Sequence, residues 1–263
     1  MTMEAGIENV IHRLFPDSLI DVRTFEDWCC NIREGAQSGA ANLISLLEKR
    51  LVRGKNECRT VSGLSRDYWE LFGGEGDKTI KSVASIRSKL ARDLMDEKIT
   101  APKETEASLQ QKILEFSDLG RVRIVADFPS DVAYLQEKLF SGGKFLEKYD
   151  CPKGVKDFVF DPSKRDGLKG HRALQFSARV PFDDTSDFGF EVQLMTRLQH
   201  AWDRRNHPFY EWQREEPGWN NNQAAIELAV NDFACAEALH LVDRQADQNW
   251  QQLQKLIKKE KKS

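Results

Sequence analysis

Residues 190–196 are the stretch that most limits how this chain folds. Phe-Glu-Val-Gln-Leu-Met-Thr begins with apolar and polar side chains in alternation, which is the period of a β-strand with one buried face. The residues that follow, 197–203, change to a helical spacing. The polar face of the strand holds Glu191 beside Gln193 in fixed positions. Such a carboxylate can accept a proton or bind a metal, although an exposed glutamate on a half-buried strand gives the same pattern.

A second strand is expected just before this one. Residues 171–181 alternate in the same way, and the polar run 183–187 between them is typical of a turn. The sequence therefore predicts an antiparallel hairpin of 171–181 with 188–196. Its polar face would gather His171, Gln175, Glu191 and Gln193.

A third strand, 118–127, begins with an acid and carries Arg121 and Arg123 on one face. Upstream, the segment 78–92 has a helical pattern in which Lys81, Ser85 and Lys89 share one face. Two ammonium groups with a hydroxyl between them suit a phosphate, while a solvated basic face explains the same spacing.

The two ends of the chain are expected to be helical. Residues 1–53 have helical apolar spacing, and 222–258 contain neither proline nor glycine. The second stretch predicts one or two helices that pack through an apolar seam, on the domain or on a second copy of the chain. That seam is Leu239, Val242, Ala246, Trp250, Leu253 and Ile257.

Composition excludes several classes of protein. The net charge of −3 gives no overall field for nucleic acid, so only a local basic cleft could serve that purpose. The five cysteines form no CxxC pair and no zinc spacing, which favours a reducing compartment. We find no signal-peptide pattern and no apolar run of membrane-spanning length. The expected location is the cytoplasm, without a membrane partner.

Four blocks in order resemble the synthetase domain of the RelA/SpoT family, the alarmone synthetases. The resemblance covers about Lys78 to Tyr210, and the order of the blocks makes it specific although each block alone is weak. The blocks are Lys81-Ser82-x-x-Ser85-Ile86-x-x-Lys89-Leu90, Asp118-Leu119-x-x-Val122-Arg123-Ile124-Val125, Val155-Lys156-Asp157-Phe158-Val159-x-x-Pro162 with Gly170-His171-Arg172-Ala173-Leu174, and Glu191-Val192-Gln193-Leu194-x-Thr196 with His200-Ala201-Trp202 and His207-x-x-Tyr210.

This resemblance implies an α+β fold with a mixed, mostly antiparallel, nucleotidyltransferase-like sheet flanked by helices. The expected parts are an N-terminal helical segment (1–75), the synthetase core (76–212) and a C-terminal helical extension (213–263), together in one compact unit. The implied reaction is Mg²⁺-dependent transfer of pyrophosphate from ATP to the 3′-hydroxyl of GDP or GTP, which makes a (p)ppGpp-type alarmone and AMP. Such an enzyme neutralises and aligns phosphates.

The resemblance also assigns roles to residues. Asp118 and Glu191 would be catalytic and hold Mg²⁺, which prefers oxygen ligands, and Glu191 would also accept or orient the proton of the attacking hydroxyl. The residues expected to bind ATP phosphates are Lys81, Ser85, Lys89 and Arg123. Those expected to bind the acceptor are Lys156, Asp157, His171 and Gln193.

The chain departs from the family pattern mainly on the acceptor side. His171 replaces a tyrosine that stacks on guanine, Gln175 replaces a histidine, and Met195 replaces an arginine, while Arg121 replaces a glycine. Guanine recognition is therefore open, and alternative acceptors are an adenosine nucleotide or the 3′ end of tRNA, as in toxin members. A non-catalytic nucleotide-binding module is the third alternative. No His-Asp dipeptide of the family's hydrolase occurs, and a homo-oligomer is left open.

Overall fold

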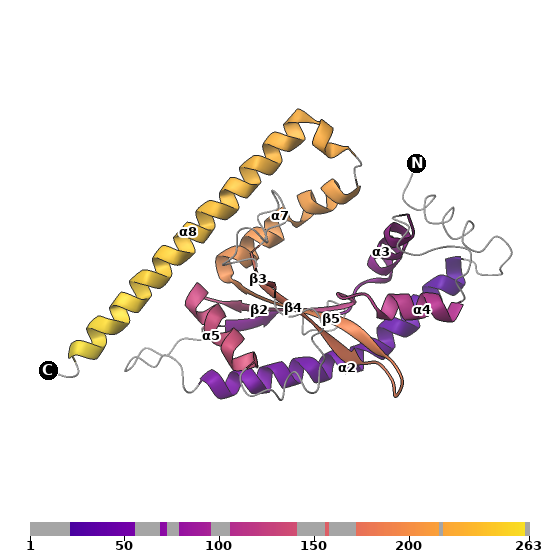
Figure 1. The fold of residues 1–263 in the computed structure, drawn as a ribbon, viewed down its shortest axis with the longest axis horizontal. Helices are drawn as coiled ribbons and strands as arrows, with labels where there is room; N and C mark the ends of the chain where they lie inside the picture. Colours follow the sequence, from indigo (N-terminus) through magenta and orange to yellow (C-terminus); the bar gives the residue numbers. More distant parts are fainter. Residues whose placement is uncertain are drawn as a thin grey trace.

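The computed structural model describes residues 22–55, 69–72, 79–95, 106–140, 156–157, 172–215 and 218–260. A five-stranded sheet lies between helices on its two faces (Figure 1). The helices are α2 (Val22–Lys55), α3 (Val83–Met95), α4 (Glu106–Leu114), α5 (Pro129–Phe140), α7 (Arg197–Glu215) and α8 (Gln223–Glu260), with a short 3₁₀ turn, η4 (Trp219–Asn221). The strands are β1 (Trp69–Phe72), β2 (Gly120–Ala126), β3 (Lys156–Asp157), β4 (Leu174–Pro181) and β5 (Asp187–Thr196).

The sheet has the strand order β1-β2-β5-β4-β3. Only the central β2–β5 pair is parallel among the described strands, and the other neighbours are antiparallel. The α+β class and the mostly antiparallel sheet are therefore confirmed. The predicted hairpin is confirmed as well, since β4 and β5 pair from Leu174 opposite Leu194 to Pro181 opposite Asp187.

Alternation along the three central strands gives the sheet one apolar and one polar face. On the apolar face, neighbouring strands stack Val122, Val192 and Phe176 in one row and Ile124, Leu194 and Leu174 in the next. This face shares one buried core with side chains of α2, α3, α4 and α5. Because α2 contributes Leu43, Leu47 and other fully buried residues to that core, the N-terminal helix is part of the main packing unit. The division into 1–75, 76–212 and 213–263 stays a prediction.

Two glycines let the chain before β2 approach the sheet. A Cβ on Gly189 would lie 2.7 Å from Ser117 Cα, and one on Gly120 would lie 2.7 Å from Cε2 of Phe190, with another atom of that ring closer still. Both distances are too short for a side chain, so these positions require glycine. The close approach holds Asp118 at the edge of the polar face.

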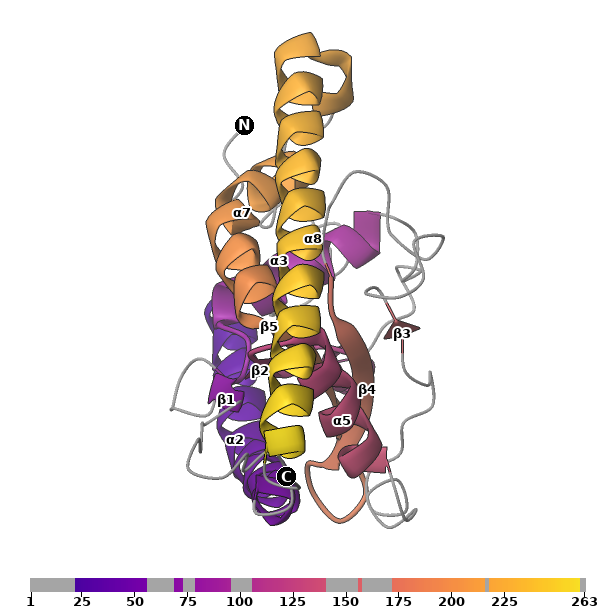
Figure 2. The ribbon, with the colours of Figure 1, turned by 90° about the vertical axis from the view of Figure 1, so that its left-hand side faces the viewer.

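The C-terminal stretch forms a single helix, α8, which runs along α7 and past α5 (Figures 1 and 2). The predicted apolar seam is only partly covered within one chain, because Val242 is 55% exposed and Leu253 is 42% exposed, while the other four members are half-buried. The positions of α8 that are buried instead are Ala225, Ala229, Ala236, Asp243 and Asp247. Small alanines allow close helix packing, and the two acids reach polar groups beyond α8. No helix in the described ranges combines the length and the apolar character needed to cross a membrane.

The two acids of α8 are anchored to the end of β5 and the start of α5. The Thr196 hydroxyl donates to Asp243, and the Ser130 hydroxyl donates to Asp247 over 2.6 Å. The Ser130 backbone N–H also donates to Asp247, over 3.0 Å, which places a carboxylate at the N-terminus of α5. We refer to Ser130, Thr196, Asp243 and Asp247 as the α8 cluster.

Candidate functional site

Asp118 is brought next to Lys81 by a short backbone pairing. Arg121 N–H donates to the carbonyl of Thr79 over 2.8 Å, and Lys81 N–H donates to the carbonyl of Leu119 over 2.9 Å. The segment that holds Lys81 therefore pairs in the antiparallel sense with the start of β2. The Nζ of Lys81 lies 2.9 Å from Asp118 Oδ2. The expected helical stripe is wrong here, since α3 begins at Val83 and Lys81 precedes it.

The second lysine comes from α3. Lys89 forms an ion pair with Asp118 Oδ1 and lies over the ring of Phe116, 4.5 Å from its centre. Ser85 is exposed, and its backbone N–H and its hydroxyl both bond the Ser82 hydroxyl, over 3.2 and 3.0 Å. Ser82 thus caps the helix. The two expected lysines converge on one carboxylate, and Ser85 lies in the first turn of α3, bonded to the capping Ser82.

The polar face of the sheet arranges its side chains in two rows. Arg121 on β2 is opposite Glu191 on β5, and Arg123 is opposite Gln193. Gln193 is in turn opposite Gln175 on β4. The predicted gathering of Gln175, Glu191 and Gln193 is confirmed, while His171 lies outside the described residues.

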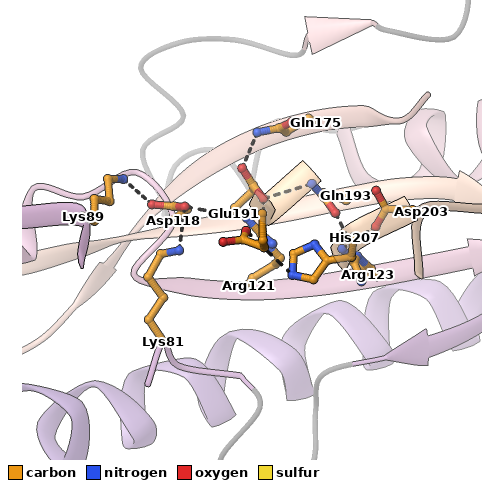
Figure 3. A network of polar contacts seen from close by, with 11 residues as sticks. Lys81, Lys89, Asp118, Arg121, Arg123, Gln175, Glu191, Gln193, Asp203 and His207 are labelled. Atoms are coloured by element: carbon orange, nitrogen blue, oxygen red, sulfur yellow. Dashed lines mark hydrogen bonds and ion pairs between the residues drawn. The ribbon is translucent and has the colours of Figure 1, made fainter. Parts of the chain in front are cut away.

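Glu191 is the most enclosed carboxylate of this face, with 5% of the residue exposed. Arg121 Nε lies 2.7 Å from Glu191 Oε1, and the Gln193 amide donates to the same oxygen over 3.0 Å. The Gln175 amide donates to Oε2 (Figure 3). Both oxygens of Glu191 are therefore fixed in place.

Arg123 links the sheet to the following helix. Its Nε donates to Gln193 Oε1 over 3.0 Å, and its NH2 group lies 2.6 Å from Asp203 Oδ2 on α7. Gln193 thus connects Glu191 to Arg123, so its amide is engaged within the protein. His207, one helical turn beyond Asp203, is more than half exposed and lies 3.9 Å from Glu211. Figure 3 draws it next to Arg123 and Asp203.

We call this network the site cluster. It consists of Lys81, Lys89, Asp118, Arg121, Arg123, Gln175, Glu191, Gln193 and Asp203 (Figure 3). Four of these side chains are cations and three are carboxylates, so the cluster has a formal charge of 4 − 3 = +1. Such an arrangement suits an anionic ligand whose oxygens replace the carboxylates as partners of the cations.

Neighbouring opposite charges in the site cluster shift each other's pKa toward the charged form. Burial raises the pKa of Asp118, but Lys81 and Lys89 outweigh it and lower that pKa to about 2. Burial lowers the pKa of Arg121, and Glu191 and Asp118 reverse this, so the net direction is upward. Burial lowers the pKa of Arg123, and Asp203 offsets part of the decrease. Asp118 is thus an anion and Arg121 a cation at neutral pH.

The acceptor-side residues are only partly described. The backbone of Lys156 and Asp157 forms β3, which pairs with β4 so that Lys156 is opposite Gln175. Met195 is buried in a small apolar cluster with Val125 and Ala173, at the end of the polar face. No cation therefore stands at the position of the family's arginine.

Sequence reasoning missed two members of the cluster. Arg121 was placed on one strand face with Arg123 but was given no role in the site, although the parallel pairing of β2 with β5 sets it opposite Glu191. Asp203 follows β5 by two helical turns, and a helix that begins directly at the end of a strand can fold back over the sheet. The direct change from strand to helix after residue 196 was therefore the sequence signal that could have pointed to Asp203.

Two carboxylates of the site cluster carry the oxygen atoms that divalent cations prefer as ligands. No group of three or more His, Cys, Asp or Glu side chains suited to a metal occurs within the described ranges. Asp118 and Glu191 are nevertheless oxygen donors, and Mg²⁺ in nucleotide enzymes is commonly held by one or two carboxylates together with substrate phosphates. These two residues fit that mode once a phosphate ligand takes over their cationic partners.

Known structures show the same arrangement of elements. Small alarmone synthetase 1 from Bacillus subtilis, bound to its product pppGpp, superposes with a TM-score of 0.56 at 16% identity, over 81% of this chain and 94% of that chain. The chain has the fold of a small alarmone synthetase. Small alarmone synthetase 2 from Bacillus subtilis gives 0.53 at 19% identity, over 81% and 96%. A GTP pyrophosphokinase family protein from Streptococcus pneumoniae gives 0.53 at 18%, over 82% and 92%.

Sequence comparison adds no further relative. The chain matches no protein-family model and no curated protein. The alarmone synthetase fold, inferred above from four short blocks, is thus confirmed by structural similarity at low identity.

Proposed function

We propose that this chain is an ATP-dependent pyrophosphokinase. The observation that carries the proposal is the site cluster, in which Asp118 and Glu191 face a group of four cations on a sheet with the alarmone synthetase fold. The similar Bacillus subtilis synthetase 1 was solved with pppGpp and with AMPCPP. The favoured acceptor is accordingly GDP or GTP. We propose in addition that the sheet is of the nucleotidyltransferase-like type.

The reaction moves the two outer phosphates of ATP as one group. The 3′-hydroxyl oxygen of the acceptor attacks the β-phosphorus, the bond from that phosphorus to the α–β bridging oxygen breaks, and AMP leaves. The hydroxyl proton passes to a base, for which Glu191 is the candidate because both its oxygens are held in fixed directions.

The cations would align the triphosphate. Lys81 and Lys89 share Asp118 in the free protein, and Arg123 pairs with Asp203. An incoming triphosphate supplies oxygens that compete for these partners. Ser85, in the first turn of α3, could add a hydroxyl contact. Mg²⁺ held by Asp118 and Glu191 would neutralise charge that develops on the transferred group.

A specific observation favours a second candidate acceptor. Met195 is 1% exposed and packs against Val125 and Ala173, and the amide of Gln175 is bonded to Glu191. The acceptor side therefore lacks the arginine and histidine of the family pattern. The same chemistry on an adenosine nucleotide or on the 3′ end of tRNA is the alternative. Lys156, Asp157 and His171 remain acceptor-binding proposals.

Incubation with [γ-³²P]ATP and Mg²⁺ tests this function. GDP, GTP, adenosine nucleotides and total tRNA are offered separately, and products are resolved by chromatography and gel electrophoresis. Label on a guanosine nucleotide supports the alarmone reaction, and label only on tRNA or an adenosine nucleotide supports the second candidate. Absence of label on every acceptor contradicts both and leaves a non-catalytic nucleotide-binding module.

A further inference from the structure

Arg121 occupies the space between the two carboxylates to which metal binding was assigned. It follows Asp118 by three residues and is directly opposite Glu191 in the parallel register of β2 and β5. Its Nε lies 2.7 Å from Glu191 Oε1, and its NH2 group lies 3.6 Å from Asp118 Oδ2. One guanidinium therefore contacts both carboxylates (Figure 3).

This contact is more enclosed than an ordinary surface ion pair. The side chains of Asp118 and Glu191 are 18% and 7% exposed, so water screens their charges only partly. A guanidinium does not lose its proton at physiological pH and provides several donors in a fixed plane. The pair of acids is thus neutralised by a cation that belongs to the protein.

We propose that Arg121 acts as a built-in counter-ion of the Asp118–Glu191 pair and makes divalent metal binding depend on a bound nucleoside triphosphate. This inference rests on the proposed function. A bare Mg²⁺ or Mn²⁺ ion meets a cluster of charge +1 and has to displace Arg121 from Glu191. A triphosphate adds negative charge and offers oxygens to the cations, so that both carboxylates become available to the metal that enters with it.

The proposal predicts how Mn²⁺ affinity changes with nucleotide and with removal of Arg121. The wild-type protein binds Mn²⁺ weakly alone, and addition of AMPCPP raises its affinity for Mn²⁺. Arg121→Gln removes the guanidinium and keeps a polar side chain, so Mn²⁺ binds the variant about tenfold or more tightly without nucleotide, the effect of roughly one close charge. The added replacement Glu191→Gln in the same chain abolishes this gain.

A matched control is provided by Arg179. It lies on β4 of the same sheet and pairs with one carboxylate, with its Nε donating to Asp187 over 2.6 Å. Arg179→Gln changes the net charge equally and frees a single acid away from the pair. Its affinity for Mn²⁺ should equal that of the wild type.

The experiment is a titration followed by electron paramagnetic resonance of free Mn²⁺, with and without AMPCPP. Equal Mn²⁺ affinity in wild type and Arg121→Gln overturns the inference, as does wild-type affinity that is already high without nucleotide. Arg121→Met, which keeps the aliphatic stem, replaces the glutamine variant if that variant does not fold. Calorimetric titration with AMPCPP separates the two proposals, because absence of nucleotide binding contradicts the proposed function, whereas nucleotide binding without a rise in Mn²⁺ affinity contradicts only the role of Arg121.

Discussion

The site cluster and the α8 cluster both hold buried carboxylates against the same sheet, but their partners differ in charge. Asp118 is paired with Lys81 and Lys89, whereas the described partners of Asp243 and Asp247 are hydroxyl, amide and backbone N–H groups. The pKa of Asp118 is lowered to about 2, because the two lysines lower it by more than burial raises it. The pKa of Asp243 is raised to about 6, because burial dominates over hydrogen bonds from Thr196 and Gln199 while Asp247 adds to the rise.

This difference separates two uses of the same chemical group. When a carboxylate is paired with lysines, an anionic ligand can take its place as the partner of those lysines. Such a carboxylate suits a binding site. Asp243 and Asp247 are held by neutral donors and have no cation for an anionic ligand to bind. They instead anchor α8 to Thr196 and Ser130. Substitutions in the two clusters should therefore differ in kind as well as in size.

The largest expected effect is on catalysis. Glu191→Gln keeps the shape of the side chain but cannot accept a proton, and Asp118→Asn removes a proposed metal ligand and the anion shared by two lysines. Each should lower the initial rate of AMP release by about 10²–10⁴-fold. Asp243→Asn should leave the rate near that of the wild type. A comparable loss in Asp243→Asn would break the distinction between the clusters.

The second effect is on stability and has opposite signs in the two clusters. Unfolded aspartate has a pKa near 3.8, so at pH 8 the raised pKa of Asp243 costs the folded state about 2–3 kcal/mol. Asp243→Asn removes that cost and should raise the free energy of unfolding by up to this amount. Asp118→Asn should lower it by about 2 kcal/mol, because Lys81 and Lys89 lose their anion.

The pH dependence gives the sign of each effect. The destabilisation from Asp243 appears as pH rises from about 4 through 6, since the folded pKa lies above the unfolded one. The stabilisation from Asp118 is present above about pH 4 and is lost as pH falls toward 2. Urea unfolding from pH 4 to 8 should show the gain of Asp243→Asn growing with pH, and a gain that is constant across this range would refute the assignment.

A smaller effect is expected on nucleotide binding. Lys81→Gln and Lys89→Gln each remove one proposed charged contact to the triphosphate, and each should weaken AMPCPP binding about tenfold in calorimetry. Arg179 is paired with Asp187, so Arg179→Gln should bind AMPCPP as the wild type does. Equal weakening in all three variants would indicate a general charge effect instead of a site.

The smallest effect concerns the hydroxyl anchors of α8. Thr196→Val keeps the side-chain shape but removes the hydrogen bond to Asp243, and the free energy of unfolding should fall by about 1–2 kcal/mol. The loss should shrink when Asp243→Asn is also present, because a neutral amide needs the donor less than a carboxylate does. Additive losses in the double variant would show that the two residues do not act together.

The sequence predicted those parts of the fold that depend on local alternation. The polar face with Gln175, Glu191 and Gln193 follows from the period of two in β4 and β5. Lys81 was placed on a helix that in fact begins after it, because a backbone pairing with the start of β2 overrides the helical spacing. The buried acids of α8 could not be predicted from the sequence, because Asp243 and Asp247 gain their partners Thr196 and Ser130 only through the tertiary fold.

Glu191 and its cationic neighbours are proposed to move pyrophosphate from ATP to the acceptor as a single group. Phosphorus-31 nuclear magnetic resonance of the products of ATP and the preferred acceptor tests it most directly, with wild type, Glu191→Gln and Asp243→Asn run together. We expect AMP and a 3′-diphosphorylated acceptor in equal amounts from the wild type and Asp243→Asn, and only a small fraction of either product from Glu191→Gln. Release of ADP in place of AMP, or the same products from Glu191→Gln, would contradict it.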